Sequence, residues 1–188
     1  MLSKPREYRF DDKLKASYGV IDGADISIRG LLMRIIFGAE KITRASKFDD
    51  QAGTDYWVIC SGGIRISIDV KTRDQDFWLR HGNDDLAIEI WSVVEKQIVG
   101  WSRDSRKQAH YILWFWKETG RWCLVPFRML CLITTRSWQE WEAKYKTATQ
   151  FTPSKEGGWH SKCVFVPRKE IWRLIYRWFG GESFVTPN

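Results

Sequence analysis

The chain has 188 residues, of which 44% are hydrophobic and 28% charged, so it can fill the core of one domain and is not a disordered chain. It has no apolar run of roughly 18 residues and no apolar stretch near its start, so we expect a cytoplasmic protein without a membrane span or secretory signal. Thirty basic against 23 acidic residues give a net charge of +7, which favours a polyanionic partner such as DNA or RNA but also suits an ordinary basic protein.

A helix and five strands are predicted in the first two thirds of the chain. A basic arm over residues 1–18 precedes apolar residues at helical spacing, which predict a helix over 26–37 that Gly38 ends. Runs of apolar residues then predict strands at 54–60, 64–71, 86–94, 110–117 and 121–127. Short turns join the first two and the last two of these strands into hairpins. Because the third strand is almost wholly apolar, we expect it in the interior of the sheet.

The last third of the chain predicts mainly helices. Ser137, followed three residues later by Glu140, matches a capping box at the start of a helix. A short strand over 163–166 and a helix from Pro167 to Gly180 follow. This order of elements indicates an α/β layered domain. We expect a single domain made of a core and a C-terminal set of helices with a short strand, over residues 26–130 and 137–180 respectively.

Cysteine, histidine and tryptophan point to structural roles. The four cysteines form no CxxC pair and the three histidines are scattered, so a zinc site is not expected. Most of the 12 tryptophans follow the apolar periodicity, which favours the core over a base-stacking surface or the exposed row of rings of a carbohydrate binder.

The first hairpin determines how its two strands face each other. If Ser-Gly-Gly forms a three-residue loop, Val58 lies opposite Ile66 and Tyr56 opposite Ile68, and one face of the hairpin is continuously apolar. A shift by one residue would turn every side chain over and mix the two faces. The pattern therefore predicts this register.

The same register places Asp55 opposite Asp69, with Cβ atoms roughly 5 Å apart. Two carboxylates at that separation repel each other, and a divalent cation such as Mg²⁺ or Mn²⁺ would remove the conflict. Lys71 lies two residues beyond Asp69 and points to the same face, where an ammonium can orient a water molecule or offset charge on a phosphate. Alternating polar residues are equally typical of a solvated sheet face, and the residues alone leave both interpretations open.

The pattern Gly53-Thr54-Asp55, followed after a turn by Ile68-Asp69-Val70-Lys71, resembles the signature of the PD-(D/E)XK nucleases. Thr-Asp stands where the family has Pro-Asp, and Asp-Val-Lys matches (Asp/Glu)-x-Lys. The helix, the hairpin and the third strand are similar to the family's core order over residues 26–117. The resemblance implies a restriction-endonuclease-like or Holliday-junction-resolvase-like αβββαβ core. That core is a mixed central sheet flanked by helices, here with a C-terminal helical extension.

The activity implied by the resemblance is Mg²⁺-dependent hydrolysis of phosphodiester bonds, in DNA more than in RNA, by an endonuclease or an exonuclease. Asp55, Asp69 and the backbone carbonyl of Val70 would bind the metal, and Lys71 would assist the attacking water. Small members of this fold often pair to cut two strands, so a homodimer is a further expectation.

Two glutamates are additional candidates for the site. Many family members carry another acid from the first helix, and Glu40 is the best-placed residue for it, although a solvated helix terminus explains Glu40 as well. Glu89 lies in an otherwise apolar strand, where a charge is costly without a cation. It would therefore reach the metal or pair with an arginine or lysine.

Basic and polar residues outside the hairpin are candidate contacts to nucleic acid, and each is also explained as solvated surface. These residues are Arg73, Arg103, Arg106, Lys107, Gln108, Arg173 and Arg177. The alternative to a nuclease is a catalytically inactive module of the same fold that binds nucleic acid or a protein, for which metal would make no difference.

Overall fold

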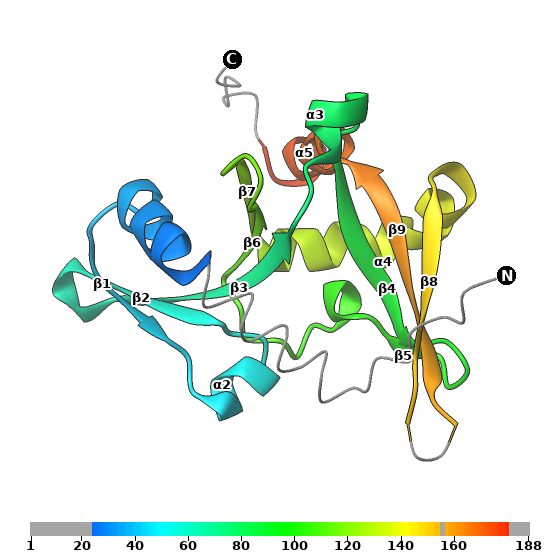
Figure 1. Cartoon of the computed structure of the whole chain (residues 1–188), viewed down its shortest axis with the longest axis horizontal. Helices are drawn as coiled ribbons and strands as arrows, with labels where there is room; N and C mark the ends of the chain where they lie inside the picture. The colour runs from blue at the N-terminus through cyan, green and yellow to red at the C-terminus, as the bar shows by residue number, and fades with distance from the viewer. Residues whose placement is uncertain (1–23, 155–156, 181–188) are drawn as a thin grey trace, which may run out of the picture.

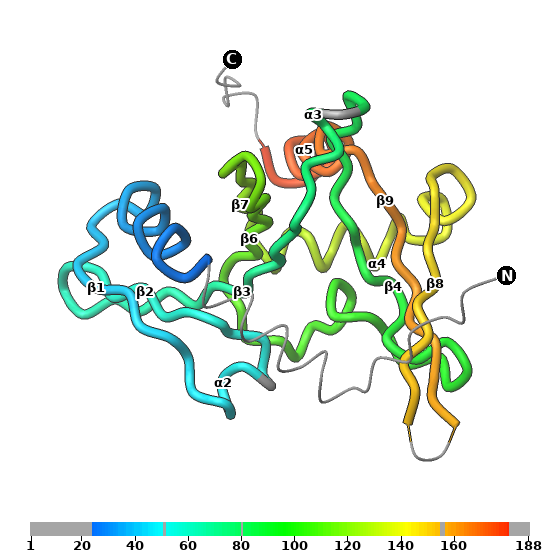
Figure 2. Tube along the Cα trace, in the orientation of Figure 1, coloured from blue at the N-terminus to red at the C-terminus, as the bar shows by residue number. Residues whose placement is uncertain are grey.

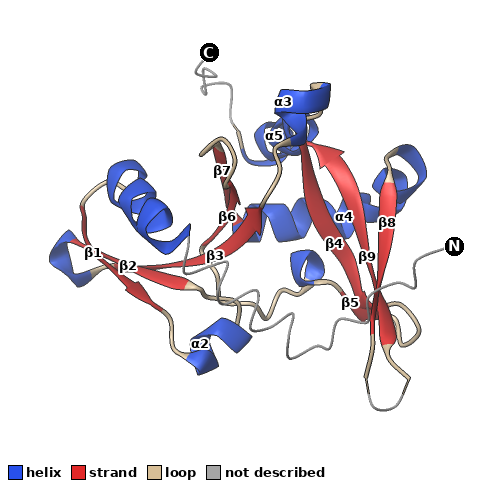
Figure 3. Ribbon diagram, in the orientation of Figure 1, coloured by secondary structure: helices blue, strands red, loops and turns tan. Residues whose placement is uncertain are grey.

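The computed structural model describes residues 24–154 and 157–180 (Figure 1), so the basic arm expected over residues 1–18 lies outside it. In the described residues the strands form two sheets, drawn in red in Figure 3. The first sheet has the order β1 (Ala39–Arg44), β2 (Tyr56–Cys60), β3 (Arg65–Arg73), β6 (Tyr111–Trp116) and β7 (Trp122–Pro126). The second sheet has the order β5 (Ile98–Val99), β4 (Asp85–Val93), β9 (Trp159–Pro167) and β8 (Thr147–Thr152).

Helices cover these sheets, which confirms a mixed α/β architecture. The first helix spans residues 24–35, close to its predicted range, and Gly38 follows it with a φ of 72°. The remaining helices are α2 (Lys47–Gln51), η1 (Ser61–Gly63), α3 (Phe77–His81), η2 (Trp101–Arg103), α4 (Phe127–Lys144) and α5 (Arg168–Phe179). No helix in the described ranges is long and apolar enough to cross a membrane.

The first hairpin has the predicted register. Tyr56 pairs with Ile68 and Val58 with Ile66 in the antiparallel ladder between β2 and β3. These four residues pack with the first helix in one hydrophobic cluster. Because strand side chains alternate between faces, Asp69 and its odd-numbered neighbours on β3 point to the opposite face.

The strand over 86–94 is β4, and its place differs from the prediction. It is an interior strand, but of the second sheet, where it lies between β5 and β9. The strand that pairs with β3 is β6, which runs parallel to it and is buried along nearly its whole length. Because β6 contributes apolar side chains to the cores on both of its faces, it takes the interior position beside β3. The chain leaves β3 through α3 and returns along β4 into the second sheet (Figure 2).

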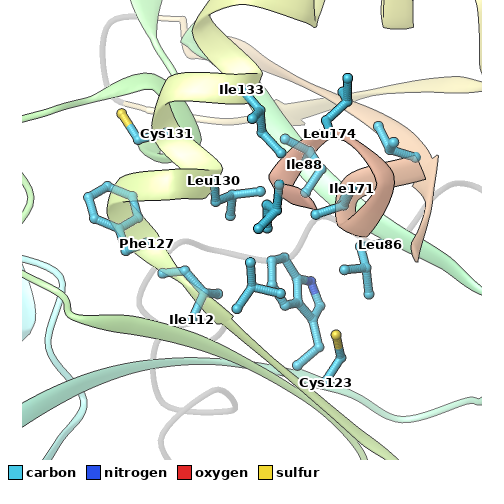
Figure 4. Packing of buried hydrophobic residues seen from close by; sticks show 14 of the residues in the cluster. Leu86, Ile88, Ile112, Cys123, Phe127, Leu130, Cys131, Ile133, Ile171 and Leu174 are labelled. Carbon is cyan, nitrogen blue, oxygen red and sulfur yellow. The ribbon is translucent and has the colours of Figure 1, made fainter. Parts of the chain in front are cut away.

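A larger hydrophobic core joins the two sheets. Ile88 of β4 and Ile112 of β6 pack there against Leu130 of α4 and Ile171 of α5 (Figure 4). Trp141 and Trp114 lie in the same cluster and are fully buried, as the apolar periodicity predicted for most tryptophans. This core fixes the second sheet against the inner strands of the first.

Three elements differ from the sequence prediction for local reasons. Helix α4 begins at Phe127, not at Ser137, because apolar residues at helical spacing continue upstream and Pro126 precedes the first turn. The strands β1 and β8 were not predicted, since only Ile42 of β1 and no residue of β8 is buried. The second hairpin, β6–β7, and the last helix, α5, confirm their predictions.

Candidate active site

A cavity of about 510 Å³, hereafter the site cavity, lies between the β2–β3 hairpin and the segment that runs from β4 through η2 to Lys107. Asp55, Asp69, Val70 and Lys71 form the wall contributed by the hairpin. The facing wall comes from the second sheet and the connection after it: Glu89, Ser92, Ile98, Val99, Trp101, Asp104, Arg106 and Lys107. The cavity therefore brings the hairpin together with a segment that follows it by about 20 to 50 residues in the sequence.

Asp55 extends the hairpin beyond the end of β2. Its backbone N–H donates to the carbonyl of Ile68 at 2.8 Å, and its Oδ2 accepts a 2.6 Å hydrogen bond from the backbone N–H of Val70. Burial, reinforced by the negative charge of Asp69, raises the pKa of Asp55 to about 7, against the smaller opposing effects of Lys71 and the Val70 hydrogen bond. The carboxyl of Asp55 is therefore held where its negative charge is not fully compensated.

Asp69 and Lys71 form an ion pair on the same face of β3. Asp69 is 6% exposed, and its Oδ1 accepts a 2.6 Å hydrogen bond from the Lys71 ammonium. Burial lowers the pKa of Lys71, but Asp69 and Asp55 outweigh it and the net pKa is raised. The Lys71 Nζ also lies 4.9 Å from the centre of the Trp101 ring. Lys71 is thus a firmly protonated cation between two carboxylates and an aromatic wall.

The residues on this wall fit a divalent cation. In a strand, the N–H and C=O of one residue point to the same side. Because the Val70 N–H donates to Asp55, the Val70 carbonyl also points to that side, just beyond the last pair of the β2–β3 ladder. Two carboxylates and one carbonyl are oxygen ligands of the kind that Mg²⁺ and Mn²⁺ prefer. Within the described residues no group of three or more His, Cys, Asp or Glu side chains could hold a metal. Water would therefore complete the coordination of a cation held here.

Glu89 reaches the site cavity from the facing wall. Its Oε1 accepts hydrogen bonds from the Ser92 hydroxyl at 2.6 Å and from the backbone N–H of Trp101 at 3.3 Å. Burial lowers the pKa of Lys71, and the charge of Glu89 adds a smaller upward effect to those of Asp69 and Asp55. Glu89 therefore lies on the site cavity opposite the hairpin, where its charge acts on Lys71.

Glu40 lies away from the site cavity. It is exposed near the start of β1, where β1 pairs with the Cys60 end of β2. Five residues of β2 separate that end from Asp55, about 16 Å along an extended strand. Asp25 of the first helix is also outside the cavity, because it accepts a 2.7 Å hydrogen bond from the Tyr56 hydroxyl on the apolar face of the hairpin.

Two of the arginines considered as nucleic-acid contacts have other surroundings. The Arg103 guanidinium lies between the rings of Trp91 and Trp138, at 4.6 and 4.4 Å from their centres, and donates to the Ile90 carbonyl at 3.2 Å. It therefore links β4 to α4 through a partly buried guanidinium. Arg73 points into a different cavity at the far end of β3.

The other candidate contacts divide between the site cavity and the rest of the surface. Arg106 and Lys107 line the cavity, and Arg106 is bound to Asp104 at 2.8 Å while its side chain stays 83% exposed. Gln108 is exposed beside the cavity but does not line it. On α5, Arg173 pairs with Glu170 at 2.7 Å and Arg177 is exposed, and neither lines the cavity.

Several site residues carried no signal in the sequence. Asp50 of α2 lines the cavity and adds a small upward effect to the pKa of Asp55. Ser92, near the end of β4, and Trp101, at the start of η2, lie on the facing wall. Comparison with known proteins finds no family model, no curated protein and no solved structure that matches this chain.

Proposed function

We propose that the chain is a metal-dependent nuclease that hydrolyses phosphodiester bonds in DNA with Mg²⁺ or Mn²⁺. One observation carries the proposal: Asp55, Asp69 and Lys71 share one wall of a single cavity, with the pKa of Asp55 raised to about 7 by burial and by Asp69. A buried carboxyl whose pKa is strongly raised, in a cavity with other charged groups, is typical of functional sites rather than of a solvated sheet face.

Each residue has a role that follows from its position. Asp55, Asp69 and the Val70 carbonyl would hold the cation, which supplies positive charge for the phosphate under attack and acidifies water. The Lys71 ammonium, 2.6 Å from Asp69, orients the attacking water and offsets the charge that develops on the phosphate. Arg106 and Lys107 line the same cavity and offer positive charge to the flanking phosphates.

The order of elements supports the resemblance to the PD-(D/E)XK nucleases. The first helix, the antiparallel strands β1, β2 and β3, and the parallel neighbour β6 follow one another as in an αβββαβ core. From the sequence alone, the three strands of this core are expected to be the hairpin and the strand over 86–94. In the fold, the three consecutive strands of the first sheet are β1, β2 and β3. Where that core has its second helix, this chain has α3, β4, β5 and η2, which supply the facing wall of the site cavity.

The proposal is tested by incubating the protein with linear, circular, single-stranded and branched DNA in Mg²⁺, Mn²⁺ or EDTA. Wild type is compared with Asp69→Ala and Lys71→Ala, and with Asp74→Asn as a matched control. Asp74 follows β3 directly, its side chain is 76% exposed, and it does not line the site cavity. We expect metal-dependent cleavage in wild type and Asp74→Asn, and its loss in the two site variants.

The same assay separates the nuclease from an inactive module. If wild type cuts no substrate with either metal but still binds DNA or a protein, the nuclease proposal is overturned and the binding module takes its place. Cleavage that persists unchanged in Asp69→Ala would point to a contaminating enzyme or to another site. The preferred substrate would show whether single-stranded, double-stranded or branched DNA is cut.

A further inference from the structure

A second cavity, of about 350 Å³, lies at the other end of β3 and shares no residue with the site cavity. Its walls come from the ends of β3 and β4, from α3, from β6 and from the β8–β9 pair. The residues that decide its chemistry are Arg73, Phe77, Asp85, Trp116, Lys146 and Phe165. A volume of this size suits a small molecule.

Arg73 presents an uncompensated cation to the second cavity. Its guanidinium carries five N–H donors, and one of them is used in a 2.9 Å hydrogen bond to the neighbouring Thr72 carbonyl. Burial lowers the pKa of Arg73, and no carboxylate of the described residues raises it. A largely buried guanidinium without a carboxylate partner is costly, so an anion with several acceptor oxygens would stabilise it.

Lys146 places a second cation on the rim of the second cavity. It is exposed just before β8, with its Nζ 6.0 Å from the centre of the Phe165 ring. The structure shows no ion pair for Lys146 within the described residues. Arg73 and Lys146 together offer two positive charges to this cavity, which suits a phosphate dianion.

The remaining walls suit a flat aromatic group with hydrogen-bond donors. Phe77 is 54% exposed with one face stacked on His81, and Phe165 is half-buried, so each ring can offer one face to a flat group, while Trp116 is almost wholly buried. Asp85 is half-buried at the start of β4, and burial, followed by repulsion from Asp84, raises its pKa. Asp85 also lines the second cavity, where its carboxyl oxygens can accept a hydrogen bond from an N–H group of a ligand.

We propose that the second cavity is a binding site for a nucleoside 5′-monophosphate. The phosphate would bind Arg73 and Lys146, the base would stack against Phe77 and Phe165, and an N–H of the base would donate to Asp85. The same chemistry occurs in a free mononucleotide and in the 5′-phosphorylated end of a DNA strand. This inference stands on residues other than those of the proposed nuclease site and does not depend on it.

The experiment is isothermal titration calorimetry of the full chain in EDTA with dAMP, dGMP, dCMP and TMP. Deoxyadenosine and inorganic phosphate are titrated separately as the two halves of the ligand. A 5′-phosphorylated tetranucleotide distinguishes a strand end from a free nucleotide. The variants are Arg73→Gln, Lys146→Gln and Asp85→Asn, with Arg136→Gln as the matched control, since Arg136 lies over the Trp178 ring on another surface.

We expect one nucleotide per chain, and binding about ten- to hundredfold weaker in Arg73→Gln, because a charge-assisted hydrogen bond is lost. Lys146 is exposed, so Lys146→Gln will fold even if the Arg73 variant does not, and it should weaken binding of the nucleotide but not of deoxyadenosine. Asp69→Ala and Arg136→Gln should bind as wild type. The proposal is overturned if no nucleotide binds at millimolar concentration, or if Asp69→Ala abolishes binding while Lys146→Gln leaves it intact.

Discussion

The raised pKa of Asp55 predicts that replacing this residue with asparagine stabilises the protein at alkaline pH. The pKa is about 7 in the folded chain against an ordinary value of 3.8. Because the folded pKa is higher, the native state holds this proton more tightly than the unfolded state. The stability linked to Asp55 is therefore fully present below pH 3.8 and is lost as the pH rises through 7.

The magnitude follows from the size of the shift. Three pKa units correspond to an upper limit of about 4 kcal/mol, of which about 2–3 kcal/mol is lost between pH 5 and pH 8. Asp55→Asn removes the charge but keeps an oxygen that can accept the hydrogen bond from the Val70 N–H. We expect the variant to be more stable than wild type by about 2 kcal/mol at pH 8, because water and Lys71 screen part of the repulsion. For a domain of this size such a gain raises Tm by about 4–8 °C.

The measurement is urea denaturation followed by tryptophan fluorescence, in EDTA, at pH 5 and pH 8. The free energy of unfolding of Asp55→Asn should exceed that of wild type by a margin that widens toward pH 8. Asp74→Asn, which removes an exposed carboxylate, should show no such widening. A margin that is equal at both pH values, or a variant less stable than wild type at pH 8, would refute the claim that Asp55 is a buried and repelled carboxyl.

Three further changes test the surroundings of the site. Lys71→Met removes the cation 2.6 Å from Asp69 and should lower the free energy of unfolding by about 2 kcal/mol at pH 8. Adding Mg²⁺ to the same urea titration should largely restore this stability. Arg103→Met removes the guanidinium between two tryptophan rings and should lower stability by about 1–2 kcal/mol while DNA affinity, measured by fluorescence anisotropy, stays unchanged. Gly100→Ala would place a Cβ 2.1 Å from the Glu89 carbonyl oxygen and should cost about 1–3 kcal/mol in urea denaturation. Gly30→Ala, in open space on the first helix, should instead stabilise the protein by about 0.5–1 kcal/mol.

The hairpin was predictable because its information is local. Alternation of apolar residues over β2 and β3 admits one register, and that register alone brings Asp55 and Asp69 to the same face. The sheet to which β4 belongs was not predictable in this way. Strand β4 is excluded from the first sheet because β6, which lies far along the chain, takes the position beside β3. Both faces of β6 are apolar and pack into the two cores.

Other features were hidden because their sequence signal was weak or misleading. Strand β8 has no buried residue, and an edge strand of this kind shows no alternation. Ser137 and Glu140 have the spacing of a helix start, but the apolar periodicity of α4 already runs through them. The position of Arg103 between Trp91 and Trp138 joins three segments that are distant in sequence, so these ring contacts could be seen only in the folded chain.

Metal binding at Asp55 and Asp69 is tested by a Mn²⁺ titration followed by electron paramagnetic resonance, on a preparation whose DNA cleavage is assayed in parallel. Wild type should bind Mn²⁺ at the two aspartates, and binding and cleavage should be lost together in Asp69→Asn but not in Asp74→Asn. If Asp69→Asn binds Mn²⁺ as wild type does, or if DNA is cut with no dependence on bound metal, Asp55, Asp69 and Lys71 do not form a metal-dependent nuclease site.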